Sequence, residues 1–346
     1  MRLLLLLSIT SATAFHAVPA TRLQPTPGAP APAHLARSSP QLKLRGGYAA
    51  QMTALSPVAT SAAVFGAANA LGLGISAIFN GCHLHLDLIG TGAFAVAAWA
   101  LRGTTVAQQA SAGAVAAWAV KLASFLFFRA CITKKDLRLD ETLSTFSGQF
   151  GFWFISFLWG WLVSLPHTLA TGVPIGERPP FGRVHVAGLT MFALGLLLET
   201  AADLSKWFFK ASSANAGKFC DVGVWNLCQH PNWFGNLLIW TGILILNSPT
   251  LLSGIGAGTG SVRILGGRLA IPATVGALCR FGLAAVSPAF LFMLFSGQAN
   301  GVPPLNKGFD MMMAKHGSSK AFQEYDAVTP RLIPTLASIA RWLRGA

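Results

Sequence analysis

The sequence predicts an all-α integral membrane protein with about seven transmembrane helices. Hydrophobic residues make up 53% of the 346 residues and charged residues only 10%, whereas a soluble domain carries about 25% charged residues. The apolar residues are also grouped into long runs, separated by shorter polar segments. A helix needs about 20 predominantly apolar residues to cross a bilayer, and several of these runs approach that length. A lipid bilayer is therefore the expected environment of the chain.

The first 50 residues are predicted to be a targeting segment. Residues 1–15 contain one positive charge, a short apolar run and small residues ending in Ala12-Thr13-Ala14, which is the pattern of a secretory signal peptide. Residues 16–47 are rich in Ala, Pro, Ser and Arg and lack acids, as transit peptides do. This order resembles the bipartite presequence of algae with complex plastids. We divide the chain into residues 1–50 for targeting and 51–346 for the membrane domain. The expected location is a plastid membrane, with the endoplasmic reticulum as the alternative.

Seven apolar segments are the candidate membrane spans of this domain. They cover residues 55–79, 84–101, 110–128, 149–171, 183–202, 233–254 and 272–297. The first three are rich in Ala and Gly, which let helices approach closely in lipid. The Gly-rich stretch 255–270 is predicted to be a loop, and residues 298–346 are too polar to span.

Seven spans place three polar segments on the same side of the membrane. Residues 129–148, 203–232 and 298–346 together hold thirteen Lys and Arg, against five in the opposite loops. Loops with excess positive charge face the cytoplasm, or the stroma in a plastid. The formal net charge of +14 therefore fits a targeting segment and a basic membrane face. No basic stretch is interleaved with stacking aromatics, so nucleic-acid binding is not expected.

An acidic motif lies at the end of the fifth span. Glu199, Asp203 and Lys206 follow i, i+4, i+7 spacing and therefore share one helix face. Glu199 lies near the membrane boundary, where an ionised group needs a partner, and Lys206 is its predicted partner. The motif is either a self-satisfied ion pair or a polar wall for a charged cofactor.

The stretch "NLCQHPNWFGN" precedes the sixth span. Pro231 suits the first turn of a helix, so a helix is expected to begin near Asn232. The free N–H groups of that turn form an anion site, to which His230 and Asn232 can add donors and Trp233 a stacking surface. This combination suits a phosphate-bearing cofactor. The alternative is a proline-started membrane helix with an interfacial Trp.

Other polar residues offer fewer indications. In "HLHLD", His83 and Asp87 share a helix face but His85 does not, so no metal site is expected. Lys121 lies deep inside an apparent span, where a charge is costly, and is expected to face the bundle or a cavity. Tyr325 lies in a short amphipathic region of the C-terminal tail.

Four ordered motifs, between about residues 60 and 335, resemble one family. "GVWNLCQHPNWFGN" resembles the Arg-His-Pro-Asn-Tyr-Phe-Gly-Glu signature of the DUF1295 proteins, relatives of the steroid 5-alpha-reductase C-terminal domain. "ETAADLSK" resembles that family's Glu-x-x-Ala-Asp-x-Gln-Lys, and "KKDLRLDE", with Asp136, Arg138 and Asp140, its Gly-x-Asp-x-Arg-hydrophobic-Asp loop. "NGVPPLNK" and "FQEYDAVTPRLIP" resemble its tail. Gln229 replaces the signature's Arg, and Asn236 replaces its acid; the two changes are expected to offset each other.

The resemblance implies a membrane oxidoreductase of lipid metabolism. Such an enzyme uses NADPH to reduce a carbon–carbon double bond of a lipophilic substrate, and its C-terminal helices and loops form a polar cofactor pocket. The implied cofactor contacts are Asp203, Lys206, Asn215, Trp225, His230, Asn232, Gly235 and Tyr325. No catalytic pair carries over, and the candidate acids are Glu199, Asp87 and His85. Isoprenylcysteine carboxyl methyltransferases share the superfold, so an S-adenosylmethionine-dependent methyltransferase is one alternative and a non-enzymatic membrane protein another.

Overall fold

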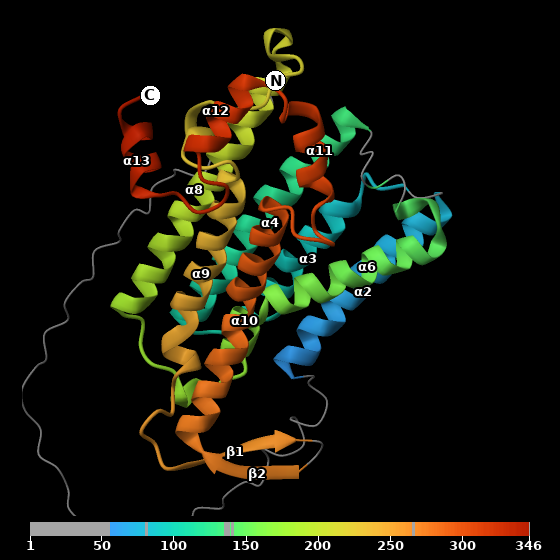
Figure 1. The fold of residues 1–346 in the computed structure, drawn as a ribbon. Helices are drawn as coiled ribbons and strands as arrows, with labels where there is room; N and C mark the ends of the chain where they lie inside the picture. Colours follow the sequence, from blue (N-terminus) through green and yellow to red (C-terminus); the bar gives the residue numbers. More distant parts are fainter. Residues whose placement is uncertain (1–55, 80–81, 135–138, 140–141, 265–266, 346) are drawn as a thin grey trace, which may run out of the picture. The chain divides into compact units, whose positions relative to one another are not determined.

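The computed structural model describes residues 56–79, 82–134, 139, 142–264 and 267–345. Helices dominate this part of the chain, with one β-hairpin, so the predicted all-α character is confirmed in its main part (Figure 1). The targeting prediction for residues 1–50 lies outside the described residues.

Eight helices correspond to the seven predicted spans. Their bounds are α2 Pro57–Ile78, α3 Leu86–Ala100, α4 Val106–Thr133, α6 Phe146–Val163, α7 Leu165–Thr171, α8 Arg183–Ala211, α9 Pro231–Leu251 and α10 Ala273–Ala299. Among the described residues, five of these helices are long and apolar enough to cross a membrane, or six if the bent pair α6–α7 counts as one span. α3 is apolar but has only 15 residues. A helix of that length is about 22 Å long, shorter than a hydrocarbon core of about 30 Å.

The polar connections carry short helices. The tail forms α11 Lys307–His316, α12 Lys320–Val328 and α13 Leu336–Leu343, as its polarity predicts. Single 3₁₀ turns occupy Thr142–Ser144, Ile175–Glu177, Ser213–Asn215 and Gly223–Asn226.

The predicted span 149–171 is broken by a 55° bend between α6 and α7. Pro166 explains the break, because its ring clashes with the carbonyl four residues earlier and it has no N–H to donate. Ser164 lies at the break, where its hydroxyl donates to the carbonyl of Trp161 at 2.8 Å and lies 3.1 Å from the hydroxyl of Ser61 on α2. These bonds satisfy polar groups that the bend would otherwise leave unpaired in an apolar surrounding.

The loop predicted over 255–270 is wrong in part, because a β-hairpin forms there. Strands β1 (Thr259–Ile264) and β2 (Gly267–Pro272) pair antiparallel, with Val262 opposite Leu269. The glycine content suggested a loop, but apolar residues alternate with Gly, Ser, Arg and Ala on both sides of a Gly-Gly pair, and that alternation suits a hairpin.

An aromatic centre holds α3, α4 and α9 together. Phe94, Trp118 and Trp240 are fully buried, and their ring centroids lie 5.1 to 5.3 Å apart. Tilted and edge-to-face contacts of this kind are the favoured geometry of aromatic pairs. The centre fixes the positions of the polar side chains next to it on α4 and α9.

Helices α8 and α9 pack backbone to backbone along a glycine seam, formed by Gly188 and Gly195 on α8 and Gly235 and Gly242 on α9. A Cβ on Gly195 would lie 2.6 Å from the carbonyl oxygen of Gly235, and a Cβ on Gly242 would lie 2.6 Å from the amide nitrogen of Phe192. In each helix the two glycines are seven residues apart, about two turns, so both lie on the contact face. Small residues permit such close approach, which supplies the packing that holds helices together in lipid.

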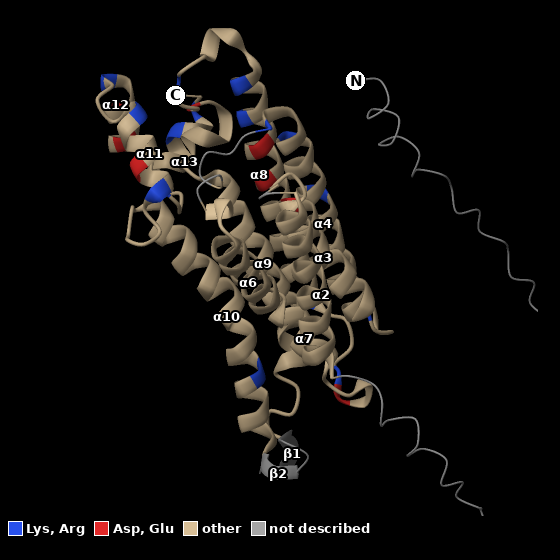
Figure 2. Ribbon diagram, turned by 90° about the vertical axis from the view of Figure 1, so that its right-hand side faces the viewer, with Lys and Arg blue, Asp and Glu red and all other residues tan. Residues whose placement is uncertain are grey.

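Charged residues gather at one end of the helical bundle. Most Lys, Arg, Asp and Glu in Figure 2 lie around α11, α12 and α13 and the adjoining end of α8. The β-hairpin lies at the other end of the bundle (Figure 1). The tail bonds to the connection between α8 and α9, since the hydroxyl of Tyr325 donates to the carbonyl of Trp225 at 2.7 Å. Segments 203–232 and 298–346 therefore meet at one end of the bundle. We call this the basic end.

Candidate functional site

A buried polar network joins α4, α8 and α9 near the basic end. The ammonium of Lys121 lies 3.3 Å from a carboxylate oxygen of Glu199 and 2.8 Å from one of Asp203. The other Glu199 oxygen accepts bonds from the amide of Asn236 at 2.9 Å and the indole of Trp118 at 3.4 Å. Glu199 is only 3% exposed, so these partners replace the water that its charge would need. We call these five residues the Glu199 network.

The predicted pairing of Glu199 with Lys206 is wrong. The partner of Glu199 is Lys121, which faces the bundle from the neighbouring helix α4. Lys206 lies on α8 about two turns beyond Glu199, toward the basic end. Helical spacing shows which residues share a face but not which helix faces them, so the pairing required the tertiary structure. The prediction that Lys121 faces the bundle interior is confirmed.

Lys206 instead belongs to a cluster around Trp225. Its ammonium lies 4.3 Å from the centre of the Trp225 ring, a cation–π contact. Trp225 is 3% exposed, and its indole donates to the carbonyl of Ala202 on α8 at 3.0 Å. The Trp225 carbonyl also accepts the hydroxyl of Tyr325. Three of the predicted cofactor residues, Lys206, Trp225 and Tyr325, are therefore brought together.

The helix predicted near Asn232 begins at Pro231, as α9. Its first-turn N–H groups, on Asn232 and Trp233, precede any intrahelical acceptor. The Trp233 ring stacks between His230, at 4.0 Å, and Phe295 of α10, at 5.4 Å. The side-chain oxygen of Asn232 is buried and has no hydrogen-bond partner among the described residues. This helix start therefore offers two donors and one open acceptor, whereas both faces of the Trp233 ring, the predicted stacking surface, are already covered.

Two cations act on this helix start. Burial, together with the positive charges of Lys206 and Arg331, lowers the pKa of His230 to about 3. His230 is therefore a neutral imidazole at physiological pH, and burial also lowers the pKa of Lys206. Arg331 comes from the tail and lies 3.5 Å from a carboxylate oxygen of Asp326. The backbone N–H of Gln229 donates to the carbonyl of Pro330 at 2.9 Å, so the neighbouring Arg331 lies beside the α9 N-terminus, where the helix dipole favours an anion.

Gln229 and Asn236 bond to different parts of the chain. The Gln229 side chain donates to Asp326 at 2.7 Å and to the carbonyl of Thr329 at 3.0 Å, and so holds the tail against the α9 start. Asn236 donates to Glu199 inside the bundle. Gln229 and Asn236 replace the Arg and the acid of the resembled signature, and each has its own hydrogen-bond partner. The two replacements therefore do not offset each other through a shared contact.

The remaining sequence candidates lie apart from this cluster or in supporting positions. Gly235 belongs to the glycine seam, and the amide of Asn215 donates to the carbonyl of Phe209 at 3.1 Å, within the loop after α8. His85 stacks on Trp153 of α6 at 5.5 Å and lies 3.0 Å from the carbonyl of Gly72 on α2.

Asp87 lies in the first turn of α3, close to His85. Glu199 contacts α4 and α9 through Trp118, Lys121 and Asn236. Asp136, Arg138 and Asp140 of the resemblance lie outside the described residues.

Sequence reasoning missed a second polar network in the bundle. The Ser111 hydroxyl lies 2.9 Å from Nδ1 of His167 and accepts the amide of Asn247 at 2.8 Å. All three side chains are buried and come from three different helices, α4, α7 and α9. The one sequence signal was a histidine directly after Pro166 in an apolar run. For metals, the described part of the chain shows no group of three or more His, Cys, Asp and Glu that could hold an ion.

Residues 75–258 match the family described as "Protein of unknown function (DUF1295)". The chain belongs to the DUF1295 family. In this DUF1295 protein the matched region holds the Glu199 network, Lys206, Trp225 and the α9 start, and it ends before the tail that carries Tyr325 and Arg331. No curated protein and no solved structure matches the chain.

Proposed function

We propose that this DUF1295 protein is a membrane-bound, NADPH-dependent reductase of a carbon–carbon double bond in a lipophilic substrate of steroid, isoprenoid or acyl type. The observation that carries the proposal is the arrangement before the N-terminus of α9, where the N–H of Gln229 donates to the carbonyl of Pro330, next to Arg331, and Lys206 lies on the Trp225 ring. Cations at a helix N-terminus suit the phosphates of a dinucleotide. The resemblance of four motifs to the relatives of steroid 5-alpha-reductase points to the same cofactor.

The groups present at the α9 start fit such a cofactor. Lys206, Arg331 and the N–H groups of Asn232 and Trp233 would hold phosphates. The unpartnered side-chain oxygen of Asn232 would accept a hydrogen bond from an amide or hydroxyl of the cofactor. Trp225, Tyr325 and Asn215 would hold the surrounding loops in place through the bonds described above.

The Glu199 network would act on the substrate. NADPH, when bound, supplies a hydride to one carbon of a polarised alkene. Lys121 lies between two carboxylates and is partly accessible, with 22% of its side chain exposed. Its ammonium would donate to a conjugated carbonyl and so polarise the double bond. Glu199 and Asp203 would hold that ammonium in position through their two contacts.

NADPH titration in detergent tests the cofactor proposal. We expect the wild type to change NADPH fluorescence on binding, and Lys206→Ala and Arg331→Ala each to weaken binding about 10- to 100-fold, because each removes a charged contact. Lys320→Ala is the matched control, since Lys320 is 90% exposed and pairs only with Glu324, 3.8 Å away. Equal affinity in all four proteins, or selective binding of S-adenosylmethionine instead, would overturn the assignment.

We further propose that the protein resides in a plastid membrane, with the basic end in the stroma. The signal-like and transit-like composition of residues 1–50 and the concentration of Lys and Arg at one end support this placement. In an alga with complex plastids, a fluorescent reporter fused to residues 1–50 is expected to accumulate in the plastid. An endoplasmic-reticulum pattern would contradict the plastid proposal.

A further inference from the structure

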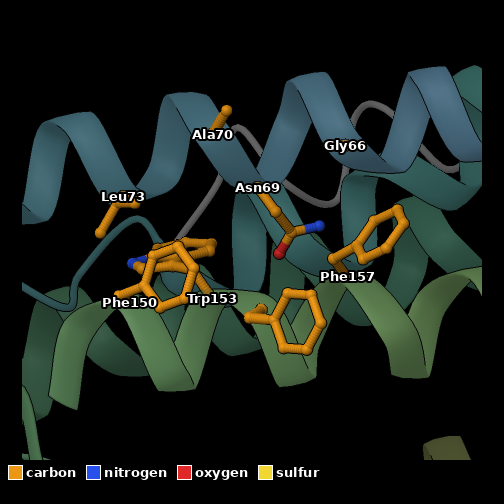
Figure 3. A pocket seen from close by; sticks show the side chains of 8 residues that line it. Gly66, Asn69, Ala70, Leu73, Phe150, Trp153 and Phe157 are labelled. Atoms are coloured by element: carbon orange, nitrogen blue, oxygen red, sulfur yellow. The ribbon is translucent and has the colours of Figure 1, made fainter. Parts of the chain in front are cut away.

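A groove of about 260 Å³ lies between α2 and α6 (Figure 3). Its lining residues come from these two helices: Gly66, Asn69, Ala70, Leu73, Phe150, Trp153, Phe154 and Phe157. Phe150 and Phe154 are 54% and 50% exposed, so the groove opens on the outer surface of the two helices. On an apolar helix pair of this kind, that surface faces lipid.

Asn69 is the one polar side chain of this lining whose hydrogen bonding is incomplete. The residue is 3% exposed, and its amide nitrogen donates to the carbonyl of Phe65 at 2.8 Å. That bond fixes the orientation of the amide, because a flipped amide would place two acceptors against each other. The side-chain oxygen is buried and has no partner among the described residues. Figure 3 shows this side chain reaching from α2 toward the aromatic rings of α6, with the oxygen on the side of the rings.

Water does not suit this acceptor. Asn69 is the thirteenth residue of the 22 in α2, so it lies about 18 Å from the first residue of the helix and near mid-membrane. The hydrocarbon core holds no water to satisfy an exposed polar group. A buried water also needs two to four polar partners. The only other polar side-chain group of the lining, the Trp153 indole N–H, already donates to Ser76 at 3.1 Å.

The aromatic floor of the groove is already formed. Trp153 is held by its bond to Ser76, by stacking on His85, and by close packing on the backbone of α2. At Gly72 an added Cβ would lie 2.2 Å from the Trp153 ring, so only glycine admits the ring there. A preformed apolar surface with one fixed polar atom is the usual character of a small-molecule site.

We propose that this groove binds the polar end of a lipophilic alcohol, whose hydroxyl donates a hydrogen bond to the side-chain oxygen of Asn69. The occupant needs one donor, because the groove offers one acceptor and no charge. Ligand pockets commonly measure about 300–1,000 Å³, so a groove of about 260 Å³ holds the hydroxyl-bearing end while the rest of the molecule lies along the helices in lipid. The proposal is independent of the reductase assignment, since it concerns binding without NADPH.

Photolabelling in lipid nanodiscs tests the proposal. The probe is hexadecanol with a diazirine near its hydroxyl end, and the labelled peptides are identified by mass spectrometry. Labelling of peptides that contain residues 66–73 or 150–157 is expected. Unlabelled hexadecanol should compete at about one-tenth the concentration of hexadecyl methyl ether, which has the same chain but no donor. Equal competition by the two compounds, or labelling spread evenly over the helices, would overturn the proposal.

Three variants separate the hydrogen bond from the shape of the groove. Asn69→Leu keeps the side-chain size but removes the acceptor, so the tenfold preference for the alcohol should vanish. Gly66→Leu should abolish labelling, because Gly66 lines the groove and a Cβ there would lie 3.9 Å from Phe157. Gly74→Leu on the same helix points into open space and should label like the wild type. An alcohol preference that survives Asn69→Leu in a protein that remains monodisperse would refute the role of Asn69.

Discussion

Replacing Lys121 by methionine is expected to destabilise the folded protein by about 3–5 kcal/mol, because it leaves two carboxylates buried without their cation. The side chains of Glu199 and Asp203 are only 4% and 11% exposed, so neither can recover much hydration. The change is measured as the free energy of unfolding in mixed micelles, or as the apparent melting temperature in one detergent.

A neutral replacement of the whole charge cluster is the control. The triple variant Lys121→Met, Glu199→Gln, Asp203→Asn should recover most of the lost stability, because buried ion groups can often be replaced without loss when all their members change together. It should remain unable to reduce substrate, since the ammonium is gone. If Lys121→Met unfolds at the same temperature as the wild type, the network does not have the burial that the structure gives it.

Replacing Gly195 by alanine is expected to cost about 1–3 kcal/mol, the range for overpacking a tight interior. The added methyl group would lie 2.6 Å from the Gly235 carbonyl oxygen and 2.7 Å from the Ile239 amide nitrogen. Both obstacles are backbone atoms, so α8 and α9 must move apart to admit it. That movement would also shift Asn236 away from Glu199 and reduce activity.

Gly113→Ala is the matched control for the seam. Gly113 lies within α4, is exposed, and has no atom within 4 Å of an added Cβ. Alanine there should stabilise the helix by about 0.5–1 kcal/mol through its higher helix propensity. Opposite signs for the two substitutions are therefore expected in the same unfolding assay. Equal effects would show that α8 and α9 do not pack through their glycines.

Hydropathy alone located the helices but not the residues at which they begin, end or break. Each predicted span overlaps a described helix, because long apolar runs have few alternatives in lipid. The sequence predicts residues 149–171 as one span. Pro166 lies inside it, but a proline in a membrane helix can either kink the helix or end it, so the break could not be predicted. The hairpin at 259–272 was missed because glycine content outweighed a weak alternation.

The site was predictable where the chemistry is local. A proline-started helix after His230 follows from a few neighbouring residues, and α9 begins there. The partners of Glu199 were not predictable, since Lys121, Trp118 and Asn236 come from other helices and 37 to 81 positions away. The glycine seam had a sequence signal, the seven-residue spacing within each helix, but its meaning depended on which two helices face each other.

Product analysis with purified protein tests whether this DUF1295 protein is an NADPH-dependent reductase. Wild-type protein in nanodiscs is incubated with NADPH and a total lipid extract, and the lipids are compared by mass spectrometry with a sample that lacks NADPH. We expect NADPH oxidation and a lipophilic product heavier than its precursor by two hydrogen atoms, both reduced in Lys206→Ala and Arg331→Ala. Folded wild-type protein that neither oxidises NADPH nor forms such a product from an extract rich in unsaturated lipids would contradict it.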